Sequence, residues 1–204
     1  FGDTAMGINA VWWRSETYAH GLLVGPIAAY LMWQRRQRLA QAAPRVQPLA
    51  LLVIGAAGTL WAVGRLGAIV SFQHFALYGL LLGGVWLVVG NAALRRAAFP
   101  LAFLVFAVPF GDFLVVPLQD FTAHFTVAAV RLIGVPIYRE GYELALPSGN
   151  WRVAEVCSGL RYVMASLVLG VLYAHLMYRS RVRQAAFVLI SLIVPVLANG
   201  LRAF

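Results

Sequence analysis

The only cysteine of the chain, Cys157, is the residue best suited to covalent chemistry. It follows a strand-like stretch and precedes a long apolar stretch with helical character, so its thiol is expected near the start of a helix. Unpaired amide groups and the helix dipole favour the thiolate there, and Arg161, four residues later, would add a positive charge. Because the thiolate is the nucleophilic form, the position favours nucleophilic catalysis. The alternative is that Cys157 packs as a small buried hydrophobe.

Arg202 is the second candidate for a direct role. A guanidinium at the end of an apolar helix can donate paired hydrogen bonds to a tetrahedral oxyanion, or it can hold an acidic group of a substrate. The alternative is an interfacial anchor whose side chain extends to the lipid headgroups. The catalytic interpretation requires Arg202 and Cys157 to lie on the same side of a membrane.

The composition predicts an all-α polytopic membrane protein. The chain has 204 residues, of which 62% are hydrophobic and 11% charged, and its mean hydropathy is +0.80. About six apolar blocks have the length of a transmembrane helix. We predict spans at residues 17–33, 49–64, 75–90, 98–117, 159–178 and 184–201. Together they predict a single membrane-embedded domain over residues 1–204, which is expected to be incomplete at both ends because it begins at Phe1 and stops directly after an apolar block.

The distribution of arginine sets the predicted topology. The links after the first, third and fifth spans contain nine arginines and no acidic residue, whereas the other segments contain seven arginines and all seven acidic residues. By the positive-inside rule the three arginine-rich links are cytoplasmic. Cys157 and Arg202 then share the outer face. The same distribution argues against nucleic-acid binding despite the net charge of +9, because the arginines form no basic stripe among exposed aromatic residues.

Two elements are predicted on the outer face between the fourth and fifth spans. Residues 118–133 have apolar positions at helical spacing, which predicts an amphipathic helix on or just within the membrane surface. A seventh buried helix is the alternative, and it fits the charge distribution less well. Residues 134–156 alternate with a period of two on both sides of residues 147–150, which predicts a short β-hairpin that leads to Cys157.

The remaining candidate residues are sorted by this topology. His175 is predicted at the cytoplasmic end of the fifth span, about 30 Å from Cys157, which excludes it as a proton partner. His20, His74 and His124 are predicted on or near the outer side, and each can also be an ordinary interfacial residue. Glu155 faces the same side and could orient Arg161 or Arg202. A lone cysteine excludes an internal disulfide or a cysteine-rich metal site, and no metal or organic cofactor is expected.

Four sequence blocks resemble the exosortase/archaeosortase family. Residues 154–161, Ala-Glu-Val-Cys-Ser-Gly-Leu-Arg, and residues 198–202, Ala-Asn-Gly-Leu-Arg, are similar to its two signature motifs. Residues 12–26 are similar to its first block, and residues 134–141 to the strand before the cysteine block. The order and spacing of the four blocks make the resemblance specific, and it extends over nearly the whole chain.

The resemblance implies a bacterial inner-membrane cysteine transpeptidase or protease whose active site faces the outside. Its substrates would be membrane-anchored proteins with a C-terminal sorting signal: a Pro-Glu-Pro motif, a transmembrane helix and a basic tail. Cys157 would be the nucleophile that forms a thioester, and Arg202 the second catalytic residue, while the acceptor of the released protein is left open. Supporting or substrate-contacting roles would go to a further set of residues: Glu155, Ser158, Arg161, Asn199 and His20.

The family carries a third catalytic residue, a histidine or an arginine, on a further helix. This position has no counterpart before Phe204, so we expect the chain to be truncated and a catalytic group to lie beyond it. A different class of protein stays open as the alternative: a non-enzymatic membrane component of an export or polysaccharide-assembly system, in which Cys157 only packs.

Overall fold

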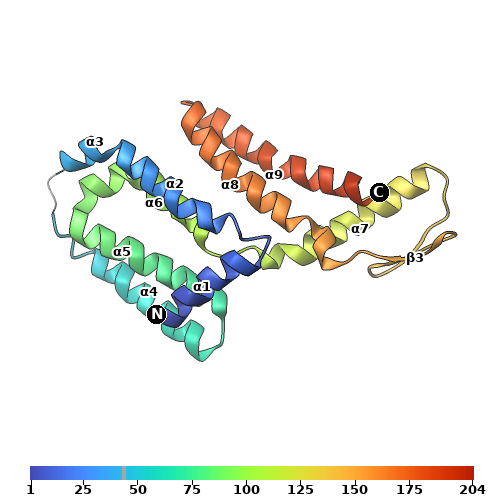
Figure 1. Ribbon diagram of the computed structural model, residues 1–204, viewed down its shortest axis with the longest axis horizontal. Coiled ribbons are helices and arrows are strands. Elements are labelled where there is room, and N and C mark those ends of the chain that lie inside the picture. Colours follow the sequence, from blue (N-terminus) through green and yellow to red (C-terminus); the bar gives the residue numbers. More distant parts are fainter. Residues whose placement is uncertain (43–44) are drawn as a thin grey trace. The chain divides into compact units, whose positions relative to one another are not determined.

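The computed structural model describes residues 1–42 and 45–204. In these residues the chain is mostly helical and contains one small antiparallel sheet (Figure 1). It divides into two compact units, Phe1–Phe110 and Gly111–Phe204. Each unit contains its own pair of closely packed helices, α4 with α5 in the first and α8 with α9 in the second.

The first unit packs around the antiparallel pair of α4 and α5. Glycines on α5 allow the close approach, because a Cβ atom on Gly83 would come within 2.8 Å of the Ile54 side chain. The indole of Trp61 donates a hydrogen bond to the Thr4 hydroxyl at 3.1 Å and thereby ties α1 to α4. The helices of this unit are α1 (Gly2–Arg14), α2 (Gly21–Gln34), α3 (Arg36–Ala40), α4 (Ala50–Leu66), α5 (Val70–Arg96), α6 (Ala98–Phe103) and the 3-10 helix η1 (Leu104–Ala107).

The second unit combines three long helices with the sheet. Its 3-10 helix η2 (Asp112–Leu114) leads into α7 (Val115–Leu132), and a second 3-10 helix, η3 (Glu155–Ser158), leads into α8 (Leu160–Met177) and α9 (Arg181–Ala203). The strands β1 (Tyr138–Glu140), β2 (Glu143–Leu146) and β3 (Gly149–Arg152) form the sheet in sequence order.

Helices α8 and α9 form a closely packed hairpin (Figure 1). Small residues permit the contact, since a Cβ atom on Gly170 would come within 2.3 Å of the Ser191 hydroxyl. Near the turn of the hairpin, the rings of Tyr173 and Phe187 stack with their centroids 5.0 Å apart. The hairpin brings the start of α8 and the end of α9 to the same end of the unit.

The structure supports a multi-pass membrane protein but does not reproduce the count of six spans. By length and composition, four helical segments of the described chain are able to cross a membrane: Val70–Arg96, Asp112–Leu132, Glu155–Met177 and Arg181–Ala203. Three apolar helical segments are shorter: Gly21–Gln34, Ala50–Leu66 and Ala98–Ala107. The first, second, third, fifth and sixth predicted spans each overlap one of these seven segments.

The fourth predicted span, residues 98–117, is wrong as a continuous helix. Helix α6 and η1 end at Ala107, and the backbone runs without helical structure until η2 begins at Asp112. Pro109 and Gly111 explain the break, because proline removes a backbone donor and Gly111 has a φ of +118°. The boundary between the two units falls in this break, after Phe110.

The predicted elements before Cys157 are present, with one addition. The β-hairpin is confirmed as β2 and β3, and a third strand, β1, pairs with β2 through a tight turn at Gly141 and Tyr142. The amphipathic helix is present as α7. Because the segment Asp112–Leu132 is long and apolar enough to cross a membrane, its position on the membrane surface stays a prediction.

Candidate active site

An apolar core holds the sheet against α7 beneath Cys157. Ala123, Val127 and Val130 face this core from α7, and Leu144, only 3% exposed, faces it from β2. The Cys157 side chain packs against the same core and is partly buried. Burial of these side chains therefore positions the segment that carries the cysteine.

Polar contacts reinforce the same interface at its edges. The buried Gln119 amide donates to the carbonyl of Val153 at 2.7 Å, which anchors the chain between β3 and η3. At the other edge, the Arg139 guanidinium on β1 donates to the Asp120 carboxylate on α7 at 2.5 Å. Both contacts join α7 to the strands that lead to Cys157.

Cys157 lies in η3, three residues before α8, and one side chain holds its backbone. The Nδ2 group of Asn199, near the end of α9, donates to the Cys157 carbonyl at 2.7 Å. It also donates to the hydroxyl of Thr122 on α7, at 3.1 Å. Asn199 is 4% exposed. A single buried amide thus joins α7, the cysteine segment and α9.

Gly159 is required at the start of α8 for two reasons. Its φ of +75° lies in the left-handed region, which side chains disfavour. A Cβ atom there would also come within 2.5 Å of the Asn199 side chain. The Gly in Cys-Ser-Gly therefore makes room for the Asn of the Asn-Gly-Leu-Arg block.

Gly200, which follows Asn199 on α9, also leaves room for a close contact. A Cβ atom on it would come within 2.9 Å of the Phe125 ring on α7. Close approach of α9 to α7 is what allows Asn199 to reach Thr122. Two glycines, one in each signature block, thus permit the same polar junction.

A pocket of about 420 Å³ opens beside Cys157. Its wall is largely apolar and comes from α7, the sheet and the end of α9. The lining includes Val130, Leu144, Leu146, Trp151, Val153 and Phe204, with Thr126, Ser148 and Arg152 as polar members. A thiol at the edge of an apolar pocket of this size can meet an extended peptide segment.

Arg202 lies close to this junction but faces a different pocket. It follows Asn199 by three positions on α9, so the two side chains are neighbours on one helix face. Its guanidinium donates to the Tyr162 hydroxyl and lies 5.2 Å from the centre of the Tyr162 ring. The pocket that Arg202 lines, about 380 Å³, is shared with Tyr162, Pro195, Ala198 and Asn199.

Arg161 meets the same tyrosine. Its guanidinium donates to the Tyr162 hydroxyl at 2.9 Å and lies 4.9 Å from the ring centre. Two cationic side chains from α8 and α9 thus converge on one phenol. The sequence analysis did not predict a role for Tyr162. The only indication in the sequence was its position directly after Arg161.

The two histidines of the second unit do not lie beside Cys157. His124 is two positions from both Thr122 and Thr126 on α7, which places it on the opposite face of the helix. It is exposed there and pairs with Asp120 at 3.3 Å. His175 is fifteen residues beyond Leu160 on α8, about 22 Å along the helix.

The other predicted residues divide between the two units. Glu155 is exposed at the first position of η3, and Ser158 is buried, with its hydroxyl accepting a weak hydrogen bond from the Leu160 amide at 3.4 Å. His20 belongs to the first unit, where its ring centre lies 6.3 Å from that of Tyr18 and its Nε2 is buried without a hydrogen-bond partner among the described residues. In the second unit the structure therefore gathers Cys157, Ser158 and Asn199, with Arg202 adjacent.

A comparison of the sequence with models of protein families finds one match. The model of the transmembrane exosortase family, Exosortase_EpsH, matches residues 12–204. The chain belongs to the transmembrane exosortase family. The matched region of this exosortase covers the first unit from Trp12 onward and the whole second unit, with all residues of the junction at Asn199. No curated protein and no solved structure matches the chain.

Proposed function

We propose that this exosortase is a membrane cysteine transpeptidase or protease and that Cys157 is its nucleophile. The observation that carries the proposal is the position of the only cysteine at the edge of an apolar pocket, with its backbone held by Asn199. Membership in the exosortase family supports a transpeptidase-type role. The substrates would be membrane-anchored proteins with a C-terminal sorting signal of the Pro-Glu-Pro type.

The reaction begins with attack of the Cys157 thiolate on the carbonyl carbon of the scissile peptide bond. In the tetrahedral intermediate the negative charge develops on the former carbonyl oxygen. Arg202, one helical turn from Asn199, would exchange the Tyr162 hydroxyl for this oxyanion. Collapse breaks the C–N bond, leaves a thioester on Cys157 and releases the amine of the membrane-anchor segment.

Proton transfer and acceptor attack complete the cycle. The leaving amine takes a proton from a general acid, for which the family resemblance implies a histidine on a further helix. An acceptor nucleophile then gives its proton to the same group, now a base, and attacks the thioester carbon; the C–S bond breaks and the Cys157 thiolate is restored. Attack by water would make the reaction a proteolysis, and attack by an amine or a hydroxyl would make it a transfer.

The decisive experiment replaces the nucleophile in the full-length protein. We expect Cys157→Ala to abolish processing of a co-expressed substrate with a C-terminal sorting signal, seen as loss of the shorter product on an immunoblot. The matched control is Val156→Ala, because Val156 is the neighbouring residue and is 83% exposed. Normal processing by Cys157→Ala would contradict the proposal and favour a non-enzymatic membrane component.

Location on the extracytoplasmic side of the inner membrane is part of the proposal. A membrane-impermeant maleimide should label Cys157 in intact spheroplasts, because the predicted topology puts η3 outside. The Cys157→Ala variant serves as the blank, since the described chain then has no thiol. Labelling only after the cytoplasmic side becomes accessible would reverse the proposed topology.

A further inference from the structure

Four exposed arginines gather where two segments of the first unit meet. Arg36 and Arg38 belong to α3, and Arg95 and Arg96 are the last residues of α5. Two hydrogen bonds join the segments: the Arg35 guanidinium donates to the Arg96 carbonyl at 3.2 Å, and the Arg96 guanidinium donates to the Arg38 carbonyl. The four exposed residues, which we call the arginine rim, therefore lie at one place on the unit.

The acidic residues of the first unit lie away from this rim. They are Asp3 and Glu16, because the sequence has no Asp or Glu between residues 17 and 111. Asp3 lies 3.9 Å from Arg65, near the turn between α4 and α5, whereas the rim is at the other end of α5. Glu16 lies in the turn before α2, and the rim follows that helix, whose 14 residues span about 21 Å. The rim is therefore a cationic site that suits an anion from outside the unit.

An apolar pocket of about 510 Å³ begins beside the rim. Leu39, the residue after Arg38, lines it from α3, and Ala97, the residue after Arg96, lines it at the end of α5. All of its lining residues in the described chain are apolar. A cationic site and a hydrocarbon-like pocket are thus adjacent in one unit.

The pocket extends inward along α5. Its lining on this helix includes Leu81, Val85 and Val89, which recur every fourth residue and so face one side. Leu81 and Val89 are about 12 Å apart along the helix axis. The hydrocarbon region of one leaflet is about 15 Å thick, half that of a bilayer. The pocket therefore offers apolar contacts over most of the depth of one leaflet.

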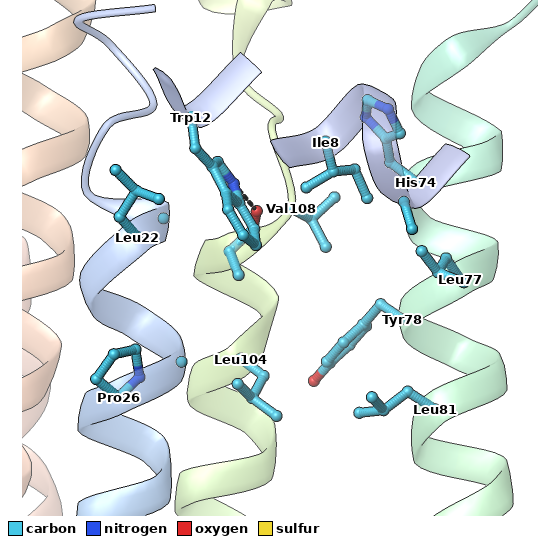
Figure 2. A pocket seen from close by; sticks show the side chains of 14 residues that line it. Ile8, Trp12, Leu22, Pro26, His74, Leu77, Tyr78, Leu81, Leu104 and Val108 are labelled. Atoms are coloured by element: carbon cyan, nitrogen blue, oxygen red, sulfur yellow. Dashed lines mark hydrogen bonds between the residues drawn. The ribbon is translucent and has the colours of Figure 1, made fainter. Parts of the chain in front are cut away.

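A second pocket, of about 320 Å³, adjoins the first (Figure 2). Leu81 and Leu104 line both pockets, and in Figure 2 they lie at the end of the second pocket away from His74. The nearby Tyr78 hydroxyl already donates to the Leu101 carbonyl, at 3.0 Å. A hydrocarbon chain that enters beside the rim can therefore reach Leu81 through apolar surroundings.

We propose that the arginine rim and the pocket beside it bind one anionic phospholipid of the cytoplasmic leaflet. The phosphate lies at the rim, where guanidinium groups donate charge-assisted hydrogen bonds to it. One acyl chain enters beside Leu39 and extends toward Leu81. The predicted topology puts the rim on the cytoplasmic side, where anionic headgroups attract arginine clusters. The site is separate from Cys157, so its test does not depend on peptide processing.

Photochemical cross-linking tests the site in the full-length protein. The protein is reconstituted in phosphatidylcholine vesicles with a trace of phosphatidylglycerol that carries a diazirine near the end of one acyl chain. We expect cross-links at Leu81, Val85 and Leu104, and a yield several times higher than with a phosphatidylcholine probe of the same chain. Equal yields with the two probes, or cross-links spread evenly over the exposed faces of α4 and α5, would overturn the proposal.

Removal of charge distinguishes the rim from general attraction to a cationic surface. One variant combines Arg36→Gln, Arg38→Gln and Arg95→Gln, which leaves the bond from Arg96 to the Arg38 carbonyl in place. We expect its phosphatidylglycerol yield to fall at least about tenfold, since each arginine near an anionic surface contributes about fivefold. The control, which should keep the yield, carries the same change at three exposed arginines at and before the start of α9: Arg179, Arg181 and Arg183. Equal losses in the two variants would show that surface charge alone attracts the lipid.

Filling the pocket tests the position of the acyl chain separately. Ala40 lines the pocket and is exposed, so Ala40→Phe adds a large side chain at its mouth. Ala98 on α6 is also exposed but does not line the pocket, which makes Ala98→Phe the matched control. We expect the phosphatidylglycerol yield to fall several-fold in Ala40→Phe and to stay at the parent value in Ala98→Phe. An unchanged yield in Ala40→Phe, or equal losses in both variants, would overturn the assignment of the acyl chain to this pocket.

Discussion

The two units bury different kinds of side chain. Among the described residues of the first unit the buried polar side chains are Thr4 and His74, whereas those of the second are Gln119, Thr122, Thr126, Ser158 and Asn199. Buried polar groups cost free energy unless they are hydrogen-bonded. Those of the second unit are bonded, and two of the bonds end on backbone carbonyls of the cysteine segment, those of Val153 and Cys157.

The two units also differ in how much added side-chain volume they tolerate at a given glycine. The first unit forms a largely apolar pocket that tolerates added volume at Gly25. The second unit holds one short backbone segment by a directional amide and has no room at Gly159. Substitutions at Gly159 and Asn199 should therefore have large effects, whereas a substitution at Gly25 should have a small one.

The largest effect is expected from Gly159→Ala. The left-handed backbone and the overlap with Asn199 together should cost about 2–4 kcal/mol of stability. The measurement is the thermal midpoint of the purified full-length protein in detergent. Gly25→Ala is the matched control and should be within about 1 kcal/mol of the parent. Equal shifts for the two glycines would remove the contrast between the units.

The second largest effect on stability is expected from Asn199→Ala. It leaves the Cys157 carbonyl and the Thr122 hydroxyl without their donor, at a cost of about 1–3 kcal/mol. The rate at which a maleimide reacts with Cys157 should also change, because the segment loses its tether. Thr122→Val removes only one of the two bonds and should have a smaller effect on both measurements. An unchanged Cys157 reaction rate in Asn199→Ala would show that the amide does not position the thiol.

The sequence predicted the helical membrane class, the hairpin and the proximity of the Cys157 and Arg202 blocks. These inferences depend on composition, on the alternation of apolar and polar residues, and on local motifs. All three can be recognised from the sequence alone. The broken fourth span was missed because its hydropathy is continuous across Pro109 and Gly111, whereas the backbone is not. Tertiary neighbours were missed for a related reason: Thr122 is distant in sequence from both Cys157 and Asn199.

Spacing along the sequence did not indicate the contact between Arg161 and Tyr162. Arg161 was expected to act on Cys157 because it follows by four residues, but Cys157 lies in η3 and outside α8. Arg161 donates to the hydroxyl of Tyr162, which is also bound by Arg202. The left-handed Gly159 between η3 and α8 changes the direction of the chain, which spacing alone does not reveal.

A smaller effect is expected at the edge of the α7 interface. Asp120→Asn weakens the contact with Arg139, whose side chain is 17% exposed while that of Asp120 is 47% exposed. The half-exposed pair should contribute about 0.5–1 kcal/mol, measured as a shift of the thermal midpoint that decreases at high salt. His124→Gln tests the other partner of Asp120 and should change less, since the His124 side chain is 69% exposed. A shift that is independent of salt would exclude an ionic origin.

The smallest effect is expected from Glu143→Gln on the sheet. Glu143 and Arg152 are cross-strand partners 3.3 Å apart, but their side chains are 57% and 74% exposed. Water screens such a pair, so its loss should cost about 0–0.5 kcal/mol. Leu144→Ala, one residue along the same strand, removes a side chain that is 3% exposed and should cost several times more. If the two variants were equally stable, charge pairing and not the apolar contact with α7 would hold the sheet beneath Cys157.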